Sequence, residues 1–300
     1  MSHAELLPLG VTAVMLPELD FDEQIELCRR LGVTHYVFRP RYISENARGK
    51  PWSNWGNHKF DLTPERLLEE GPQLAARLRE AGLVPYSTVP RLAADIDDDN
   101  ELELHLKGAA AAGCRSVRVM STPYPPGELF DYGQYLPRAR KDLARVVERA
   151  ADHGLKLVIE MHVGTTACSP GLARLLVEEF DPAKLGLILD LPNMAGEGAI
   201  RPSLAISVLA DWIDHCHVGG SRRVAGEYDE LGFRKAGQQQ TAITESDLHI
   251  PTWLQLLAQL GREIPLVIED YTPGPPGALR LEATATALQR IVGAPEPART

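Results

Sequence analysis

Cysteine, basic charge and long apolar segments are all scarce in this 300-residue sequence. It contains four cysteines and no CxxC pair, which argues against a disulfide framework and against zinc held by thiolates. No apolar run approaches the roughly 20 residues that a membrane-spanning helix requires. The N-terminal segment MSHAELLPLG also lacks the basic and apolar regions of a secretory signal. We therefore expect a cytoplasmic protein with reduced thiols.

The shortage of basic residues limits the kind of partner. Lysine and arginine total 31 against 41 acidic residues, so the net charge is -10. An acidic surface disfavours nucleic acid or an anionic membrane as the main partner, because both are polyanions. With 44% hydrophobic and 24% charged residues, the composition is that of an ordinary globular protein. A small-molecule partner is the simplest expectation.

Short apolar runs alternate with amphipathic stretches along the whole chain. The runs of strand length cover residues 9–16, 35–39, 84–89, 116–121, 155–161, 185–190, 213–218 and 265–269. Between them the sequence predicts helices near residues 20–31, 64–81, 97–112, 135–153, 170–180, 202–211, 250–261 and 278–292. Repeated strand–helix units of this kind require parallel strands.

This repetition predicts an α/β fold, a (β/α)8 TIM barrel that forms one domain over residues 1–300 with its core at about 9–292. An open, doubly wound sheet is the alternative, but no GxGxxG motif follows the first predicted strand. In a barrel, the chemistry lies at the C-terminal ends of the strands and on the loops that follow them. The loops predicted there at 40–63, 122–134 and 219–249 are long, whereas those at the opposite end are short.

Four consecutive apolar runs end in metal-ligand-type side chains, namely Glu160, Asp190, His217 and Glu269. An ionisable group that closes a buried strand is costly to desolvate unless it has a partner. Side chains along a strand point alternately to its two faces. If all four residues point into the barrel, their sequence neighbours face the helices, and these neighbours are mainly apolar, with Asp214 as the exception. Three carboxylates and one imidazole suit Mn²⁺, Mg²⁺ or Co²⁺. The sequence therefore predicts a divalent-metal site; the alternative is four unrelated polar strand ends.

The order of these segments resembles the sugar isomerase/epimerase branch of the xylose isomerase-like TIM barrels. The resemblance is carried by VIEMH (158–162), LILDLPN (187–193), HCHVGGSRR (215–223), TESDLHIPTWLQLL (244–257) and PLVIED (265–270). It implies that Glu160, Asp190, His217 and Glu269 hold a divalent ion, Mn²⁺ above all, or Mg²⁺ or Co²⁺. It also implies that the two glutamates are acid/base catalysts and that Arg223 contacts substrate oxygens. A homo-oligomer, either a dimer or a tetramer, is a further implication.

Two positions depart from that family pattern. Asn193 stands three residues after Asp190, where the family usually has histidine. Gly220 stands where an aspartate usually follows the ligand histidine. An asparagine can hydrogen-bond a substrate hydroxyl but cannot titrate. We therefore place Asn193 among the substrate-binding residues, and both departures bear on the substrate more than on the metal.

His162 and Arg39 are further candidates for substrate binding. His162 shares the inward parity of Glu160, although a brace behind the metal ligands is an equal alternative. Arg39 lies with Arg41 at the top of the second predicted strand, and paired arginines favour an oxyanion such as a carboxylate or phosphate. The alternative is that these arginines pair with an acidic neighbour such as Glu18.

The long loop at 40–63 contains Trp52 and Trp55. Trp52 is predicted to bind substrate as part of a hydrophobic lid. The alternative is an oligomer contact, because aromatic residues are enriched in both settings.

These features together predict a divalent-metal-dependent isomerase or epimerase that acts on a keto-sugar or related polyol. One glutamate would take the proton alpha to a metal-bound carbonyl, and Glu160 or Glu269 would return it. The alternative is a lyase or dehydratase on the same scaffold, inosose-dehydratase-like or keto-glycoside-cleaving, with His162 or Glu245 as the acid. The net charge argues against an abasic-site nuclease, and the intact ligand set argues against a barrel used only for binding.

Overall fold

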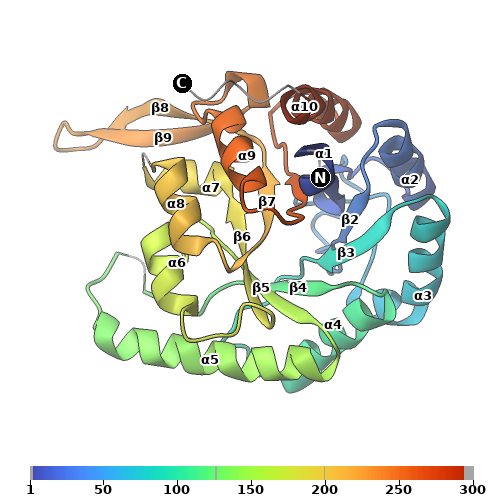
Figure 1. Ribbon diagram of the computed structural model, residues 1–300, viewed down its shortest axis with the longest axis horizontal. Coiled ribbons are helices and arrows are strands. Elements are labelled where there is room, and N and C mark those ends of the chain that lie inside the picture. The colour runs from blue at the N-terminus through green and yellow to red at the C-terminus, as the bar shows by residue number, and fades with distance from the viewer. Residues whose placement is uncertain (1–2, 126, 199, 294–300) are drawn as a thin grey trace.

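Eight parallel strands close into a barrel in the computed structural model, which describes residues 3–125, 127–198 and 200–293 (Figure 1). The barrel strands are β1 (Leu9–Thr12), β2 (His35–Phe38), β3 (Val84–Thr88), β4 (Ser116–Val119), β5 (Lys156–Glu160), β6 (Leu185–Asp190), β7 (Ile213–Val218) and β10 (Leu266–Ile268). They pair in the order β1-β10-β7-β6-β5-β4-β3-β2, and β1 also pairs with β2. The predicted (β/α)8 TIM barrel is confirmed.

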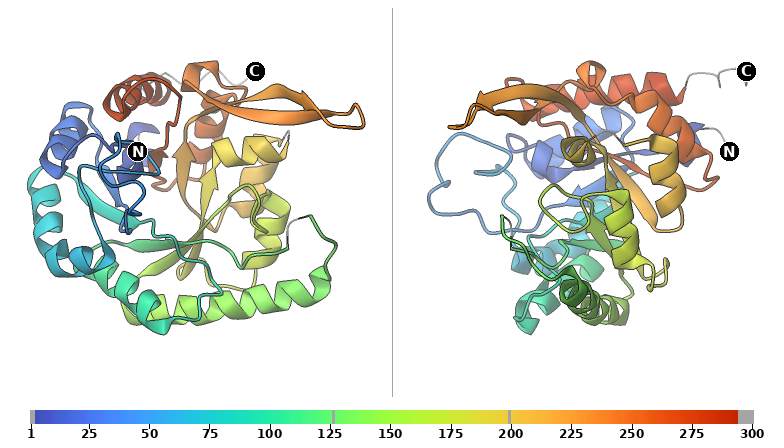
Figure 2. Two further views of the ribbon diagram at one scale, coloured as in Figure 1. Left: turned by 180° about the vertical axis from the view of Figure 1, so that it is seen from behind. Right: turned by 90° about the vertical axis from the view of Figure 1, so that its left-hand side faces the viewer.

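Helices surround this barrel on the outside (Figure 2). Those that cover it are α2 (Phe21–Arg30), α3 (Pro64–Glu80), α4 (Asp99–Ala111), α5 (Tyr132–Asp152), α6 (Pro170–Val177), α8 (Pro202–Leu209), α9 (Ile250–Ala258) and α10 (Gly277–Val292). Asp20 begins α2 with a reciprocal capping box, and Thr63 caps α3 just before Pro64, where a missing N–H does no harm. Within the described ranges, none of the helices combines the length and apolar character that crossing a bilayer demands.

Several shorter elements were not predicted from the sequence. They are α1 (His3–Leu6), α7 (Leu191–Glu197), the 3-10 helices η1 (Ala13–Met15) and η2 (Ile243–Glu245), and the hairpin strands β8 (Gly220–Tyr228) and β9 (Arg234–Thr241). The first strand, predicted over 9–16, ends at Thr12 because the chain turns into η1. Much of the predicted loop at 219–249 is instead an antiparallel hairpin that projects beyond the ring of helices (Figures 1 and 2).

Apolar side chains pack in two layers. A large cluster fills the space between the strands and the surrounding helices. A smaller cluster fills the barrel interior and consists of Val14, Val37, Tyr86, Val89 and Val267. Val267 lies two residues before Glu269, so its place in the inner cluster agrees with an inward direction for Glu269.

The predicted outward direction of Asp214 is wrong. The register of β6 with β7 shifts so that Leu187 faces Ile213 while Ile188 faces His215, which leaves Asp214 as an extra residue in a bulge. A second shift between β2 and β3 leaves Tyr86 extra in the same way. The two extra residues meet inside the barrel, where the Tyr86 hydroxyl donates to Oδ2 of Asp214 at 2.8 Å.

Candidate metal centre

The predicted ligand side chains converge at the C-terminal ends of neighbouring strands. Glu160 ends β5, Asp190 ends β6, His217 lies near the end of β7 and Glu269 directly follows β10. Because these four strands are consecutive in the barrel, their ends meet on one side of its mouth. Each residue offers one ligand atom, and these atoms all lie within 4.8 Å of one another. The structure therefore brings the whole predicted set together.

The imidazole of His217 lies among the three carboxylates. Its Nδ1 is 3.3 Å from Oδ2 of Asp190, 3.4 Å from Oε2 of Glu269 and 3.7 Å from Oε1 of Glu160. The Glu269 side chain is 13% exposed, whereas the other three are almost completely covered. Buried carboxylates this close repel one another unless a positive charge lies between them. A divalent cation that accepts oxygen and nitrogen ligands fits this donor set.

The pKa shifts of the four residues reflect the same repulsion among the buried carboxylates. Burial, with repulsion from Glu160 and Asp190, raises the pKa of Glu269 to about 7. Burial also raises the pKa of Asp190. Burial opposes the charged ring of His217, but the surrounding carboxylates outweigh it and raise the His217 pKa well above its usual range. The cluster therefore retains protons near neutral pH, and a divalent cation would replace their charge.

Arg118 of β4 belongs to this centre, although the sequence analysis missed it. Its Nε lies 2.7 Å and its Nη2 lies 2.5 Å from Oε2 of Glu160, while Nη1 donates to the carbonyl of Pro90. Burial opposes ionisation of Glu160, but Arg118 and His217 outweigh it and hold the pKa of Glu160 well below its usual range. A signal was present in the sequence, because alternation along SVRV puts Arg118 on the face opposite to its apolar neighbours.

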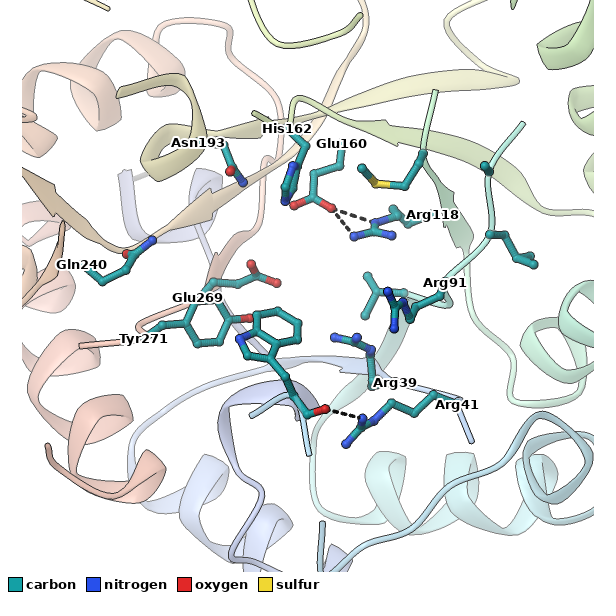
Figure 3. A pocket seen from close by; sticks show the side chains of 15 residues that line it. Arg39, Arg41, Arg91, Arg118, Glu160, His162, Asn193, Gln240, Glu269 and Tyr271 are labelled. Atoms are coloured by element: carbon teal, nitrogen blue, oxygen red, sulfur yellow. Dashed lines mark hydrogen bonds and ion pairs between the residues drawn. The ribbon is translucent and has the colours of Figure 1, made fainter. Parts of the chain in front are cut away.

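A cavity of about 540 Å³ opens at this mouth of the barrel (Figure 3). Both predicted catalytic residues, Glu160 and Glu269, line it, as do the predicted substrate-binding residues His162, Asn193 and Arg39. The lining residues that no sequence argument had assigned to the site include Arg91, Arg118, Gln240 and Tyr271. A cavity of this size, with many polar groups in its wall, accommodates a small polar molecule.

Asn193 reaches the cavity because a short helix begins at the end of β6. Asp190 is the N-cap of α7, and its Oδ1 accepts a hydrogen bond from the backbone N–H of Asn193 at 2.8 Å. Its other oxygen, Oδ2, faces His217. One carboxylate therefore both begins the helix that positions Asn193 and belongs to the candidate metal cluster.

Arg223 and Trp52, both predicted to bind substrate, do not line the cavity. Arg223 has an exposed side chain on β8, because the segment after β7 leaves the barrel mouth as a hairpin. Trp52 is 48% exposed, and Trp55 of the same loop lines the cavity instead. Glu245, one of the two candidate acids for a lyase, is exposed in η2 and also lies outside the cavity lining.

The glycines that follow His217 have a steric cause. A Cβ atom on Gly219 would lie 2.3 Å from the carbonyl oxygen of Glu269. A Cβ atom on Gly220 would lie 2.2 Å from the carbonyl oxygen of Thr241. An aspartate therefore does not fit at position 220 while the hairpin is paired, which explains this departure from the family pattern.

Comparison with solved structures finds the same fold at low sequence identity. A probable 3-DHS dehydratase from Bacillus anthracis matches with a TM-score of 0.71 and 14% identity, over 94% of this chain and 99% of that one. The IolI protein with a bound zinc atom matches with a TM-score of 0.70 and 14% identity, over 96% of this chain and 98% of that one. A 3-keto-D-glucoside 4-epimerase from E. coli matches with a TM-score of 0.64 and 15% identity, over 95% of this chain and 99% of that one.

The sequence comparisons place the chain in a family. No curated protein sequence matches it. A family model described as a xylose isomerase-like TIM barrel matches residues 50–291, which is most of the chain. The predicted resemblance rests on segments inside that range and on the barrel that the structure contains. The chain therefore belongs to the xylose isomerase-like TIM barrel family.

Proposed function

We propose that the protein is a divalent-metal-dependent isomerase or epimerase that acts on a keto-sugar or related polyol. The observation that carries this proposal is the convergence of Glu160, Asp190, His217 and Glu269 at the wall of a polar cavity, with both glutamates facing the cavity. The four residues would hold Mn²⁺, or alternatively Mg²⁺ or Co²⁺. Such an ion, when bound, polarises a substrate carbonyl and thereby acidifies the adjacent C–H group.

The two glutamates have different surroundings and therefore different roles. Arg118 holds Oε2 of Glu160, so this carboxylate is fixed and ionised, with Oε1 turned toward the metal ligands. Glu269 contacts His217 through Oε2 and is the more exposed of the two. We assign to Glu269 the removal of the proton from the carbon next to the carbonyl. Because Glu160 is ionised, it would relay a proton from solvent water to the substrate from its own side of the cavity, and Glu269 would release the proton that it has taken to solvent.

Other cavity residues would orient the substrate. His162 follows Glu160 by two residues and lies with it in the wall, and Asn193 projects from α7 on the same side of the barrel. The Asn193 amide would hydrogen-bond a hydroxyl group without exchanging a proton. The buried Oε1 of Gln240, which has no hydrogen-bond partner among the described residues, would accept from a second hydroxyl.

A lyase on the same scaffold is the second candidate. It would begin with the same proton removal and then expel a leaving group from the neighbouring carbon, which requires an acid beside that group. His162 supports this candidate, because it lines the cavity next to Glu160 whereas Glu245 does not. A structural neighbour described as a probable dehydratase supports it as well.

The test is a screen of keto-sugars, inososes and 3-keto-glycosides with Mn²⁺ in deuterated water. Deuterium incorporation without loss of mass identifies an isomerase or epimerase, and loss of water or of an aglycone identifies a lyase. Glu269→Gln should abolish incorporation while it preserves the melting temperature of the metal-free protein. Full incorporation in that variant would remove Glu269 from proton transfer. The matched control is Glu245→Gln, which alters an exposed acid outside the cavity.

The proposal also places the enzyme in the cytoplasm as a homo-oligomer, either a dimer or a tetramer. The free thiols of Cys28, Cys114 and Cys216 support a reducing compartment. Near the tip of the projecting hairpin, Leu231 is 82% exposed to solvent and Phe233 is 70% exposed. Such exposed apolar side chains support association with a second copy. Light scattering should give a multiple of the 33.0 kDa chain mass. A single-chain mass at micromolar concentration would contradict the oligomer.

A further inference from the structure

Arginines gather on one side of the cavity, opposite the residues on α7 and the hairpin (Figure 3). Arg39 directly follows β2, Arg41 lies two residues further along, Arg91 follows β3, and Arg118 lies on β4. The metal-ligand residues come from β5, β6, β7 and β10. The strand order therefore divides the cavity into a metal half and an arginine half.

Two of these arginines already have partners. Arg118 is bound to Glu160. Arg41 donates to the backbone carbonyls of Trp55 and Gly56 and so holds the loop that carries Trp55. The Trp55 ring in turn lies against the Arg39 guanidinium, with Cζ 5.1 Å from the ring centroid. Arg41 is thus a positioning residue, and Trp55 limits the directions that Arg39 can take.

Arg39 and Arg91 have no carboxylate partner within the part of the chain that the structure describes. The predicted alternative, an ion pair with Glu18, is wrong, because Glu18 accepts instead from the backbone N–H of Ala278. Nε of Arg39 is buried, and none of the described residues offers it a hydrogen-bond acceptor. Burial is the largest cause that lowers the pKa of Arg39 to about 10. A buried guanidinium without a counterion is energetically unfavourable, so an anion bound on this side of the cavity would stabilise Arg39.

The charge of the whole cavity leads to the same conclusion. The carboxylates that face it, Glu160 and Glu269, both belong to the metal set. A divalent cation and Arg118 together balance the three ligand carboxylates of that set. The charges of Arg39, Arg41 and Arg91 then remain in excess within the cavity.

We propose that Arg39 and Arg91 bind an oxyanion on the substrate, a carboxylate or a phosphate, at the end of the molecule away from the metal ligands. This inference rests on the proposed function and narrows its substrate class from keto-sugars in general to anionic ones. Two guanidinium groups from adjacent strands offer several N–H donors to the oxygens of one such group. The substrate would then span the cavity from the arginines to Glu269.

Binding of three matched polyols tests this inference directly. D-sorbitol is neutral, D-gluconate has a carboxylate in place of one terminal hydroxymethyl group of the same six-carbon chain, and sorbitol 6-phosphate has a phosphate on a terminal hydroxyl. Their affinities are measured by titration calorimetry, first on chelator-treated protein so that the anion cannot bind a metal, and then with Mg²⁺ present. We expect one anionic probe to bind about tenfold or more tightly than sorbitol, as charge-assisted hydrogen bonds require. The tighter of the two anions identifies the group.

Arginine variants locate the binding. Arg39→Met and Arg91→Met should each remove most of the advantage of the anionic probe, and Arg91→Met is informative even if Arg39→Met fails to fold, because Arg91 is exposed. Arg222→Met, on the hairpin outside the cavity lining, removes the same charge and should leave the affinity unchanged. Equal affinity for all three probes, or an advantage that survives both cavity variants, would overturn the inference.

The anion site and the proposed reaction can fail independently, and the experiments distinguish the two failures. If the anionic probe binds through Arg39 and Arg91 but no compound exchanges deuterium, the anion site stands and the proposed reaction fails. If a neutral keto-sugar exchanges deuterium at a rate that Arg39→Met and Arg91→Met leave unchanged, the reaction stands and the anionic substrate is wrong.

Discussion

Arg118 and Glu160 meet with Nε 2.7 Å from Oε2, and this contact leaves Oε1 of Glu160 facing His217. The two residues lie on the paired strands β4 and β5, where Arg118 is in register with Val158. One glutamate of the centre is therefore fixed by an arginine, whereas the other, Glu269, is contacted through Oε2 by His217. This asymmetry underlies the separate roles that we propose for the two carboxylates.

Arg118→Met should weaken metal binding most strongly under acidic conditions. Without the guanidinium, burial would raise the pKa of Glu160, and protons would compete with the metal for it. One unit of pKa corresponds to about a tenfold change in affinity below that pKa. Calorimetric titration of Mn²⁺ at several pH values measures the effect. Arg118→Lys should recover part of it, and an unchanged pH profile in Arg118→Met would contradict the role of Arg118.

Metal binding should stabilise the fold. A ligand that binds only the native state at about 100 times its Kd adds about 2.7 kcal/mol to the free energy of unfolding. We therefore expect Mn²⁺ to raise the melting temperature of chelator-treated protein, and Asp190→Asn to abolish the increase. The control Glu245→Gln should retain it, since Glu245 lies outside the metal cluster. If metal analysis finds no divalent ion and Mn²⁺ leaves the melting temperature unchanged, the metal centre is wrong.

Metal affinity should rise with pH through neutrality. Without a cation, Glu269 binds a proton below its raised pKa of about 7, and His217 binds one to a still higher pH. Because the metal-bound form holds neither proton, a lower pH favours the protein without metal. Titration calorimetry in two buffers with different ionisation enthalpies should reveal proton release at neutral pH. The absence of any release would show that these groups are already deprotonated before the metal binds.

The sequence predicted which four residues form the candidate metal cluster, because each one closes an apolar run and the parallel order of a barrel brings such ends together. It did not predict the hairpin, because strands such as RKAGQQQT have no apolar face and are held by mutual pairing. The hairpin also explains why Arg223 was misplaced. The start of α7 could have been found, since an N-cap aspartate with proline nearby was visible at Asp190 and Pro192.

Of the two bulges, the one at Asp214 was not accessible to sequence reasoning. The two-residue alternation of a strand assumes an unbroken register, and Asp214 carries no local signal that the register shifts there, whereas Pro85 beside Tyr86 is a residue that strands tolerate at bulges. The consequence is a buried carboxylate inside the barrel, which also contacts Nζ of Lys156 at 3.0 Å and Nδ1 of His215 at 3.0 Å. Burial opposes ionisation of Asp214, but His215 and Lys156 outweigh it and hold the pKa of Asp214 well below its usual range.

Tyr86→Phe should therefore destabilise the protein more than the matched change Tyr36→Phe. Both tyrosines are fully buried hydrogen-bond donors, but Tyr86 donates to the Asp214 carboxylate whereas Tyr36 donates to the neutral amide of Gln24. Loss of a bond to a charged group costs about 1.5–3 kcal/mol, against about 0.5–1.5 kcal/mol for a neutral pair. Urea denaturation of both variants measures the difference. An equal or smaller loss for Tyr86→Phe would mean that Lys156 and His215 satisfy the carboxylate without it.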